Sequence, residues 1–119
     1  MKTINIKRVY DDKSKNDGYR VLIDRLWPRG VSKEDAHFDE WLKELAPSTE
    51  LRKWFDHKPE RFDEFCKRYK EELQSHKDEL DKLRNKAKSE KLTLLFAAKD
   101  TEMNNAVVVK GILEKNEVH

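Results

Sequence analysis

The chain has 119 residues, a length that suits one compact domain with one hydrophobic core. Lysine and arginine total 26 against 24 for aspartate and glutamate, and a formal net charge of +2 argues against a dedicated nucleic-acid-binding protein. The charged fraction is 42%, but the two signs nearly cancel and the chain has 3 Trp, 3 Tyr and 5 Phe, so its composition indicates a folded domain over residues 1–119.

Three segments have the patterns of β-strands. Residues 4–9 alternate apolar and polar side chains, as a half-buried or edge strand does. Residues 20–24 form a short apolar run after a turn at Asp17 and Gly18. Residues 92–97 are the most continuously apolar stretch, which is typical of a strand buried on both faces.

The segment between the second and third strands has helical periodicity. The spacing Ser32-x-x-Asp35 suits a helix cap, and Pro47 would end the helix that follows. Its apolar residues have the i, i+3, i+4, i+7 spacing and are Phe38, Trp41, Leu42 and Leu45.

Two further helical stretches follow Pro47. Ser48 suits the cap of a short helix, and Pro59 suits the first turn of a longer one. The apolar face of the longer stretch is interrupted near residues 75–77, where we expect a break or a kink. The apolar residues of these stretches are Leu51, Trp54, Phe55, Phe62, Phe65, Cys66, Tyr69, Leu73, Leu80, Leu83 and Ala87.

The segment after the third strand favours a last helix, capped by Asp100 or Thr101. The β-branched run at residues 107–109 also permits a strand. A strand, a helical crossover and a parallel strand form a right-handed unit. The sequence therefore predicts an α/β fold, with a small, mainly parallel sheet covered by helices.

Basic and polar residues gather where the second and third predicted strands end, which is where ligands bind in α/β sheets. The candidates are Asp24, Arg25, Trp27 and Arg29 after the second strand, and Lys99, Asp100 and Asn104 after the third. If the two strands are parallel neighbours, Arg25, Arg29 and Lys99 converge beside a helix N-terminus. Such an arrangement binds phosphate or carboxylate.

The candidates that are not basic have structural as well as functional interpretations. Asp24 and Asp100 would orient the basic residues or act as a general base. Asn104 would donate hydrogen bonds, and Trp27 would stack on a planar ligand. Alternatively, Arg25 pairs with one of the two aspartates, and Trp27 only stiffens its loop.

The remaining reactive residues give little sign of chemistry. Cys66, the one cysteine, excludes an intrachain disulfide and lies on an apolar face as a core residue would. The four histidines lack metal-binding spacing, so we expect no metal. The chain has no P-loop and no Gly-x-Gly-x-x-Gly motif, and we expect no cofactor. Arg52 either reaches the strand-end residues or makes an ion pair that closes its helix onto the domain.

No segment has the apolar core of a signal peptide or the length of a membrane span, so a cytoplasmic protein without membrane contact is expected. The sequence does not indicate an oligomeric state.

Four segments of the chain carry a family resemblance. They are residues 7–11, 18–30, 47–52 and 92–95, and the second of them, GYRVLIDRLWPRG, is the most distinctive. Together they resemble the YeaO-like family, a branch of the domain-of-unknown-function 488 superfamily. The resemblance covers nearly the whole chain and implies a single α/β domain in a bacterial or archaeal cytoplasm, with no established activity.

The wider superfamily follows its last strand with the pattern Cys-x-Glu-Lys-Asp…Cys-His-Arg. This chain keeps only Lys99 and Asp100 of that pattern. The resemblance therefore does not supply the groups for thiol or metal chemistry at this loop.

The leading hypothesis is that the protein binds a small anionic, phosphate-bearing ligand at the carboxyl end of its sheet, with Arg25, Arg29 and Lys99 gripping the charge. The sequence does not decide whether the protein is an enzyme. If it is, stabilisation of a developing oxyanion is expected, with Asp24 or Asp100 as the base.

The alternative hypothesis is a non-catalytic interaction module. It would contact protein or nucleic acid through basic clusters and through the aromatic residues Tyr10, Tyr19 and Trp27. Nucleic-acid binding is the less expected of the two because the net charge is small.

Overall fold

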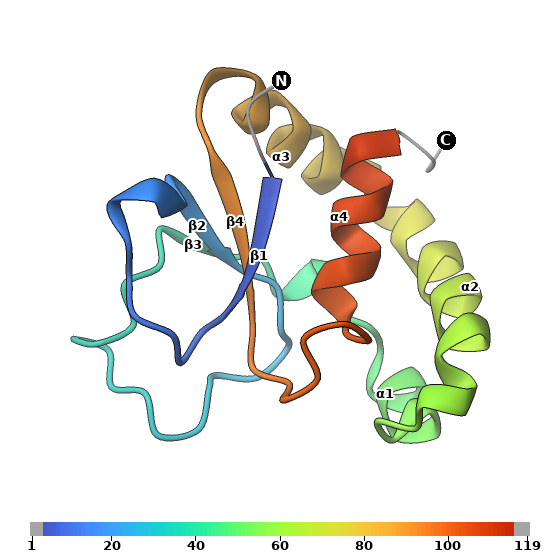
Figure 1. The fold of residues 1–119 in the computed structure, drawn as a ribbon. Coiled ribbons are helices and arrows are strands. Elements are labelled where there is room, and N and C mark those ends of the chain that lie inside the picture. Colours follow the sequence, from blue (N-terminus) through green and yellow to red (C-terminus); the bar gives the residue numbers. More distant parts are fainter. Residues whose placement is uncertain (1–3, 116–119) are drawn as a thin grey trace.

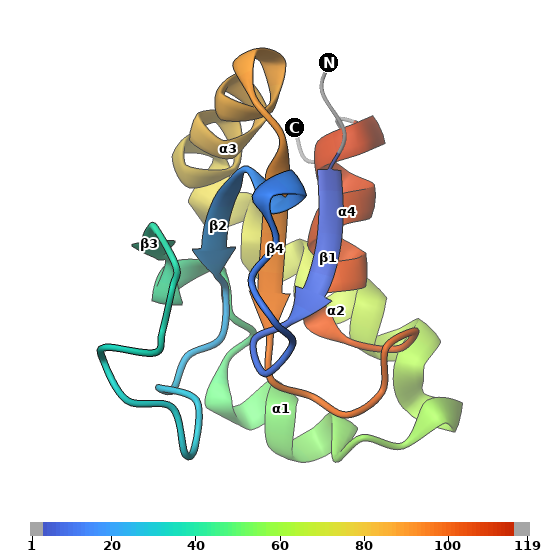
Figure 2. The ribbon, with the colours of Figure 1, turned by 60° about the vertical axis from the view of Figure 1, so that its left-hand side comes forward.

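The computed structural model describes residues 4–115, and its strands form one four-stranded sheet. The strands are β1 (Ile4–Arg8), β2 (Tyr19–Leu22), β3 (Glu40–Trp41) and β4 (Leu92–Phe96), in the order β1-β4-β2-β3. Every pairing among them is parallel, so all the strands end at the same edge of the sheet (Figure 2). The predicted α/β class with a parallel sheet is confirmed, and the continuously apolar segment is a central strand.

The helices of the described chain are α1 (Thr49–Phe55), α2 (Phe62–Leu73), α3 (Lys77–Ser89) and α4 (Asn105–Lys115). α3 and α4 pack on the sheet, and α2 packs against α1 and α4, all on one side of the strands (Figure 1). α1 lies at the end toward which the strands point (Figure 2). A 3₁₀ turn at Gln74–His76 separates α2 from α3, as the interrupted apolar face predicted.

The main core lies between the sheet and the helices. Its fully buried members include Val21 and Leu94 from the strands and Tyr69, Leu83 and Ile112 from the helices. The other face of the sheet carries a smaller apolar cluster, which is covered by loops instead of helices. This face of the sheet therefore has no second layer of helices over it in residues 4–115.

The prediction of a helix between Ser32 and Pro47 is wrong. Residues 32–36 form turns, and His37 has a left-handed backbone with φ of 48°. β3 and a 3₁₀ turn at Lys43–Leu45 follow. The N–H of Leu42 donates to the carbonyl of Leu22 (2.9 Å), so this segment bonds to the free edge of β2 instead of to itself.

The apolar residues of that segment consequently divide between the two faces of the sheet. Phe38 and Trp41 join the smaller cluster on the loop-covered face, whereas Leu42 and Leu45 enter the main core. A spacing that fits one side of a helix thus also fits an extended segment with side chains on both sides.

The last helix is confirmed as a helix but begins later than predicted. Asn104 caps it, because its Oδ1 accepts the N–H of Val107 (3.0 Å). Asp100, one of the predicted caps, instead accepts two backbone N–H bonds within a separate turn. No helix in the described chain is long and apolar enough to cross a lipid bilayer.

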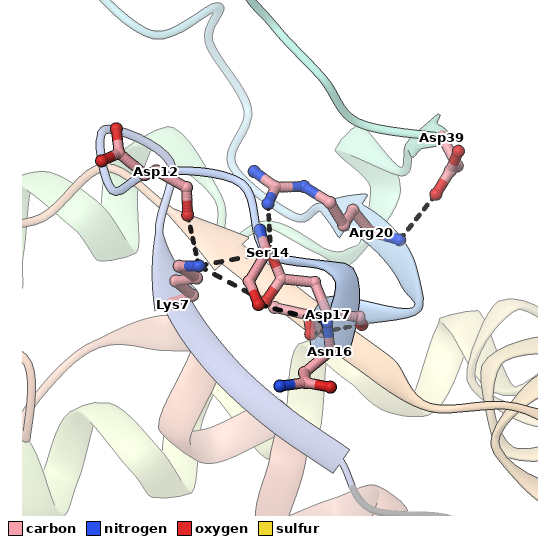
Figure 3. Close-up of polar contacts among 8 residues, drawn as sticks. Lys7, Asp12, Ser14, Asn16, Asp17, Arg20 and Asp39 are labelled. Atoms are coloured by element: carbon pink, nitrogen blue, oxygen red, sulfur yellow. Dashed lines mark hydrogen bonds and ion pairs between the residues drawn. The ribbon is translucent and has the colours of Figure 1, made fainter.

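A buried ion pair joins Asp17 to Arg20 where the chain enters β2 (Figure 3). The side chain of Arg20 is 2% exposed and that of Asp17 is 10% exposed. The Asp17 carboxylate also accepts the N–H of Ser14 (2.9 Å) and lies 3.3 Å from Lys7 Nζ. The Nε of Arg20 is buried and finds no partner among the described residues. This cluster lies where the chain enters β2, and not at the edge of the sheet where the strands end.

Candidate functional site

A cleft of about 620 Å³ opens beyond the ends of β2 and β4. Its walls come from the loop after β2, from α1, and from the residues that join β4 to α4. The volume lies within the range of pockets that bind small organic molecules. The strand-end edge, where a site was predicted, is therefore hollowed.

Asp24 lies just beyond the end of β2, after Ile23, and lines this cleft. Its Oδ2 accepts the N–H of Ala97 (2.8 Å), and its Oδ1 accepts a bond from Asn105 Nδ2 (3.0 Å). Burial raises the pKa of the Asp24 carboxyl, while the bonds from Asn105 and Ala97 and the charge of Arg52 oppose that rise. The carboxylate thus connects the end of β2 to the end of β4 and to the start of α4.

The raised pKa of Asp24 predicts a pH dependence of stability. A carboxyl whose pKa is raised by folding stabilises the folded state most when protonated, and this contribution is lost as pH rises through the folded-state pKa. We expect the free energy of unfolding of the wild type, relative to Asp24→Asn, to fall as pH rises above 4, by at most about 1.4 kcal/mol per pH unit. Urea unfolding at a series of pH values measures this difference.

A wild-type advantage over Asp24→Asn that stays constant or grows with pH would show that folding does not raise this pKa.

Four basic side chains line the cleft without an ion pair to any carboxylate in residues 4–115. Arg25 and Arg29 come from the loop after β2, and Arg52 and Lys53 come from α1. Arg25 has its Nε and Nη2 at 3.4 Å from the carbonyl of Pro47, which are long bonds. Arg29, Arg52 and Lys53 are exposed. These cations therefore have hydrogen-bonding capacity left for a ligand.

The structure brings five of the seven predicted site residues to the cleft: Asp24, Arg25, Trp27, Arg29 and Asn104. Lys99 and Asp100 are exposed in the loop after β4 and do not line the cleft. The two arginines therefore meet at one hollow, and the lysine expected to join them does not.

Asn104 and Trp27 have contacts within the chain that account for much of their position. Asn104 is buried, and its Nδ2 donates to the carbonyl of Asp100 (2.8 Å) while its Oδ1 caps α4. Trp27 donates Nε1–H to a carbonyl of its own loop (2.6 Å). Its ring lies 5.4 Å from that of Phe38 and 5.5 Å from that of Trp41, centroid to centroid. Both side chains shape the cleft as well as line it.

Helix α1 and the turn after it contribute residues that the sequence left open or did not place in the site. Arg52 had two interpretations, and Lys53 and His57 had no place in the predicted cluster. Leu51 and Phe55 are buried in the main core, which leaves Arg52 and Lys53 exposed beside the strand ends. The spacing of the apolar pair is visible in the sequence, but the position of the helix relative to the sheet is not.

The side chains that usually bind metals stay apart. In residues 4–115 no three histidine, cysteine, aspartate or glutamate side chains lie close enough to hold a metal ion. Cys66 is half-buried against the main core, and burial raises the pKa of its thiol, which lowers the thiolate fraction that a nucleophile needs.

Comparison with known proteins identifies the family. A family model described as "Inactive DUF488-N3 subclade" matches residues 3–118. "Uncharacterized protein YeaO" of Escherichia coli (strain K12) is 49% identical over 106 residues, which cover 89% of this chain and 92% of the relative. "Uncharacterized protein Rv3073c" of Mycobacterium tuberculosis (strain ATCC 25618 / H37Rv) is 42% identical over 110 residues, 92% of each chain. No solved structure matches. Because the family model matches nearly the whole chain and the Escherichia coli relative is 49% identical, the chain belongs to the YeaO-like branch of the DUF488 family.

Proposed function

We propose that this protein binds a small, phosphate-bearing anion in the cleft at the carboxyl end of its sheet. The main support is the set of unpaired cations around a hollow of ligand size: Arg25, Arg29, Arg52 and Lys53. A guanidinium presents a planar fork of N–H donors that matches two oxygens of a phosphate or carboxylate. Several such forks from separate elements favour an anion with more than one charged oxygen.

The charge balance of the cleft also favours an anion. Its lining has four lysine or arginine side chains and two carboxylates, Asp24 and Asp56. Both oxygens of Asp24 already accept hydrogen bonds from the protein, so this carboxylate is directed toward the strand ends. A positively charged hollow with apolar walls concentrates field lines and raises the local concentration of anions.

Binding without turnover is the form of this function that we favour. The family description calls the subclade inactive. Neither of the carboxylates considered as a base is available in the cleft: Asp24 is engaged through both oxygens, and Asp100 lies outside the lining. Cys66, on α2, is not a lining residue either. A stable complex with a small anion is therefore the expected outcome.

Calorimetric titration with inorganic phosphate, pyrophosphate and ribose 5-phosphate tests the proposal. Replacing Arg52 or Arg25 with glutamine should lower the affinity for the anion roughly 10- to 100-fold, because a hydrogen bond to a charged group contributes about 1.5–3 kcal/mol. Arg68→Gln is the matched control, since Arg68 is an exposed arginine on α2 that pairs with Glu64 (2.9 Å) away from the cleft.

Two results would count against the proposal. One is that none of the three phosphate compounds binds to the wild type. The other is that Arg68→Gln weakens binding as much as Arg52→Gln does, because the effect would then reflect overall charge and not the cleft.

The interaction-module alternative has less support from the contacts. Tyr19 donates its hydroxyl to Glu40 Oε1 (2.7 Å) and has Lys86 Nζ 4.5 Å from its ring centroid. Trp27 packs within its loop, so Tyr10 is the exposed member of the three aromatic residues that this alternative uses. A steep fall of affinity with salt would favour nucleic acid, whereas a small anion in a cleft depends on salt more weakly.

A further inference from the structure

The two large hydrophobic side chains that are most exposed in residues 4–115 both lie at this cleft. Leu26 is 63% exposed and Tyr10 is 43% exposed, and both belong to its lining. The other aromatic side chains of the described chain are half-buried or buried. An exposed aromatic ring and an exposed leucine beside unpaired cations indicate a ligand with an apolar part as well as a charge.

The ring of Tyr10 is held in a defined orientation. The guanidinium of Arg8 lies 5.0 Å from the ring centroid and covers one face. Arg8 is itself bonded to the carbonyls of Ala98 (3.0 Å) and Ala97 (3.3 Å), at the end of β4. The hydroxyl of Tyr10 donates to the carbonyl of Arg29 (2.9 Å). Arg8 thus contacts one face of the ring, while Tyr10 as a whole stays 43% exposed.

A ring oriented in this way suits stacking. An aromatic side chain that is already immobile loses little conformational freedom when a flat group covers it. The bond to Arg29 ties the ring to the loop that carries the cleft arginines, so the flat surface and the cations are parts of one wall. A hollow of about 620 Å³ has room for a ring in addition to a phosphate.

Resting on the proposed function, we infer that the ligand is a phosphorylated compound with a flat unsaturated ring, of which a mononucleotide is the simplest probe. The ring stacks on the free face of Tyr10, and Leu26 covers part of its edge. The phosphate meets Arg25, Arg29 and Arg52.

Three probes separate the two halves of the ligand. Adenosine 5′-monophosphate has both, ribose 5-phosphate has the phosphate without the ring, and adenosine has the ring without the phosphate. Stacking on an aromatic side chain corresponds to roughly 5- to 150-fold in affinity, so the nucleotide should bind at least about fivefold more tightly than ribose 5-phosphate. Adenosine should bind more weakly than either phosphorylated probe.

Tyr10 variants test the stacking surface itself. Tyr10→Leu should bring the affinity ratio of nucleotide to ribose 5-phosphate close to one, and Tyr10→Phe should keep the ratio well above one because the ring remains. Tyr19→Phe, which removes only a hydroxyl outside the cleft, should leave the wild-type ratio unchanged. Circular dichroism and thermal unfolding show that each variant is folded.

The outcomes separate this inference from the proposed function. If ribose 5-phosphate binds and the nucleotide binds no more tightly, the inference that the ligand has a flat ring is wrong, whereas the proposed anion site is supported. If no phosphate compound binds, both the proposed anion site and the inferred ring of the ligand are wrong. If Tyr10→Leu keeps the wild-type affinity ratio of nucleotide to ribose 5-phosphate, Tyr10 is not part of the binding site. A short oligonucleotide that binds more tightly than the mononucleotide would overturn the small-molecule assignment in favour of a nucleic-acid strand.

Discussion

Replacing Arg20 with methionine is expected to lower the free energy of unfolding by about 3–5 kcal/mol, because breaking a buried ion pair leaves a charge without its partner. The Asp17 carboxylate would keep the N–H of Ser14 and the more distant Lys7, but it would lose the guanidinium beside it (Figure 3). Stability in a domain of this size is commonly about 5–15 kcal/mol, so a large part of it is at risk. Guanidinium chloride unfolding monitored by circular dichroism measures the loss.

A second variant distinguishes the stranded charge from a general loss of packing. In Arg20→Met combined with Asp17→Leu, both charges are removed together with the unpartnered Nε of Arg20, and the protein should recover much of the lost stability. The exposed pair of Arg68 with Glu64 is the surface reference, and Arg68→Met should cost no more than about 1 kcal/mol. An Arg20→Met protein as stable as Arg68→Met would contradict the prediction.

Gly18→Ala is expected to destabilise the protein by about 3 kcal/mol or more. Gly18 has φ of 66° and ψ of −132°, a conformation that side chains rarely adopt. A Cβ at this position would lie 2.3 Å from the carbonyl oxygen of Lys91 and 2.7 Å from its Cβ. The same carbonyl accepts the N–H of Tyr19 (2.8 Å), so the two segments cannot separate without losing a bond at the start of β2. Thermal unfolding and denaturant titration measure the loss.

The other two glycines are the controls for this prediction. Gly30 has φ of 80° but nothing within 4 Å of an added Cβ, so Gly30→Ala should show only the conformational cost, roughly 1 kcal/mol. Gly111 lies in α4 with open space around it, and Gly111→Ala should stabilise the protein by about 0.5–1 kcal/mol through helix propensity. If Gly18→Ala lowered the free energy of unfolding no more than Gly30→Ala does, the close approach to Lys91 would not be the cause of the loss.

Three of the strands, β1, β2 and β4, and the helices α1 to α4 could be predicted because their patterns are local. The run at residues 92–97 is apolar except for Thr93. Such a composition is typical of a strand that has neighbours on both sides and is buried on both faces. β3 could not be predicted in this way. The spacing of Phe38, Trp41 and Leu42 fits a helix, and the outcome depended on the free edge of β2, which is distant in sequence. Long-range pairing thus prevailed over local periodicity.

The site was predictable to the extent that strand ends define it. Arg25 and Arg29 lie in the loop that begins after β2, so a correctly predicted strand placed that loop at the cleft. Lys99 likewise lies in the loop after its strand, β4, but it does not line the cleft, because the path of that loop has no local signature in the sequence. Arg52 depended on where α1 packs, and the ring of Tyr10 depended on a contact with Arg29, nineteen residues away. These positions follow from tertiary packing, which residue spacing does not encode.

The place of β4 in the sheet has a consequence for the order in which the chain can fold during synthesis. β4 lies between β1 and β2, yet it is the last strand of the described chain. Translation at roughly 5–20 residues per second leaves several seconds between the emergence of β2 and that of β4. Until then β1 has no partner, and β2 has only the two residues of β3. A ribosome that stalls before Leu92 therefore holds a chain with unpaired strand edges, which are the surfaces most prone to aggregation.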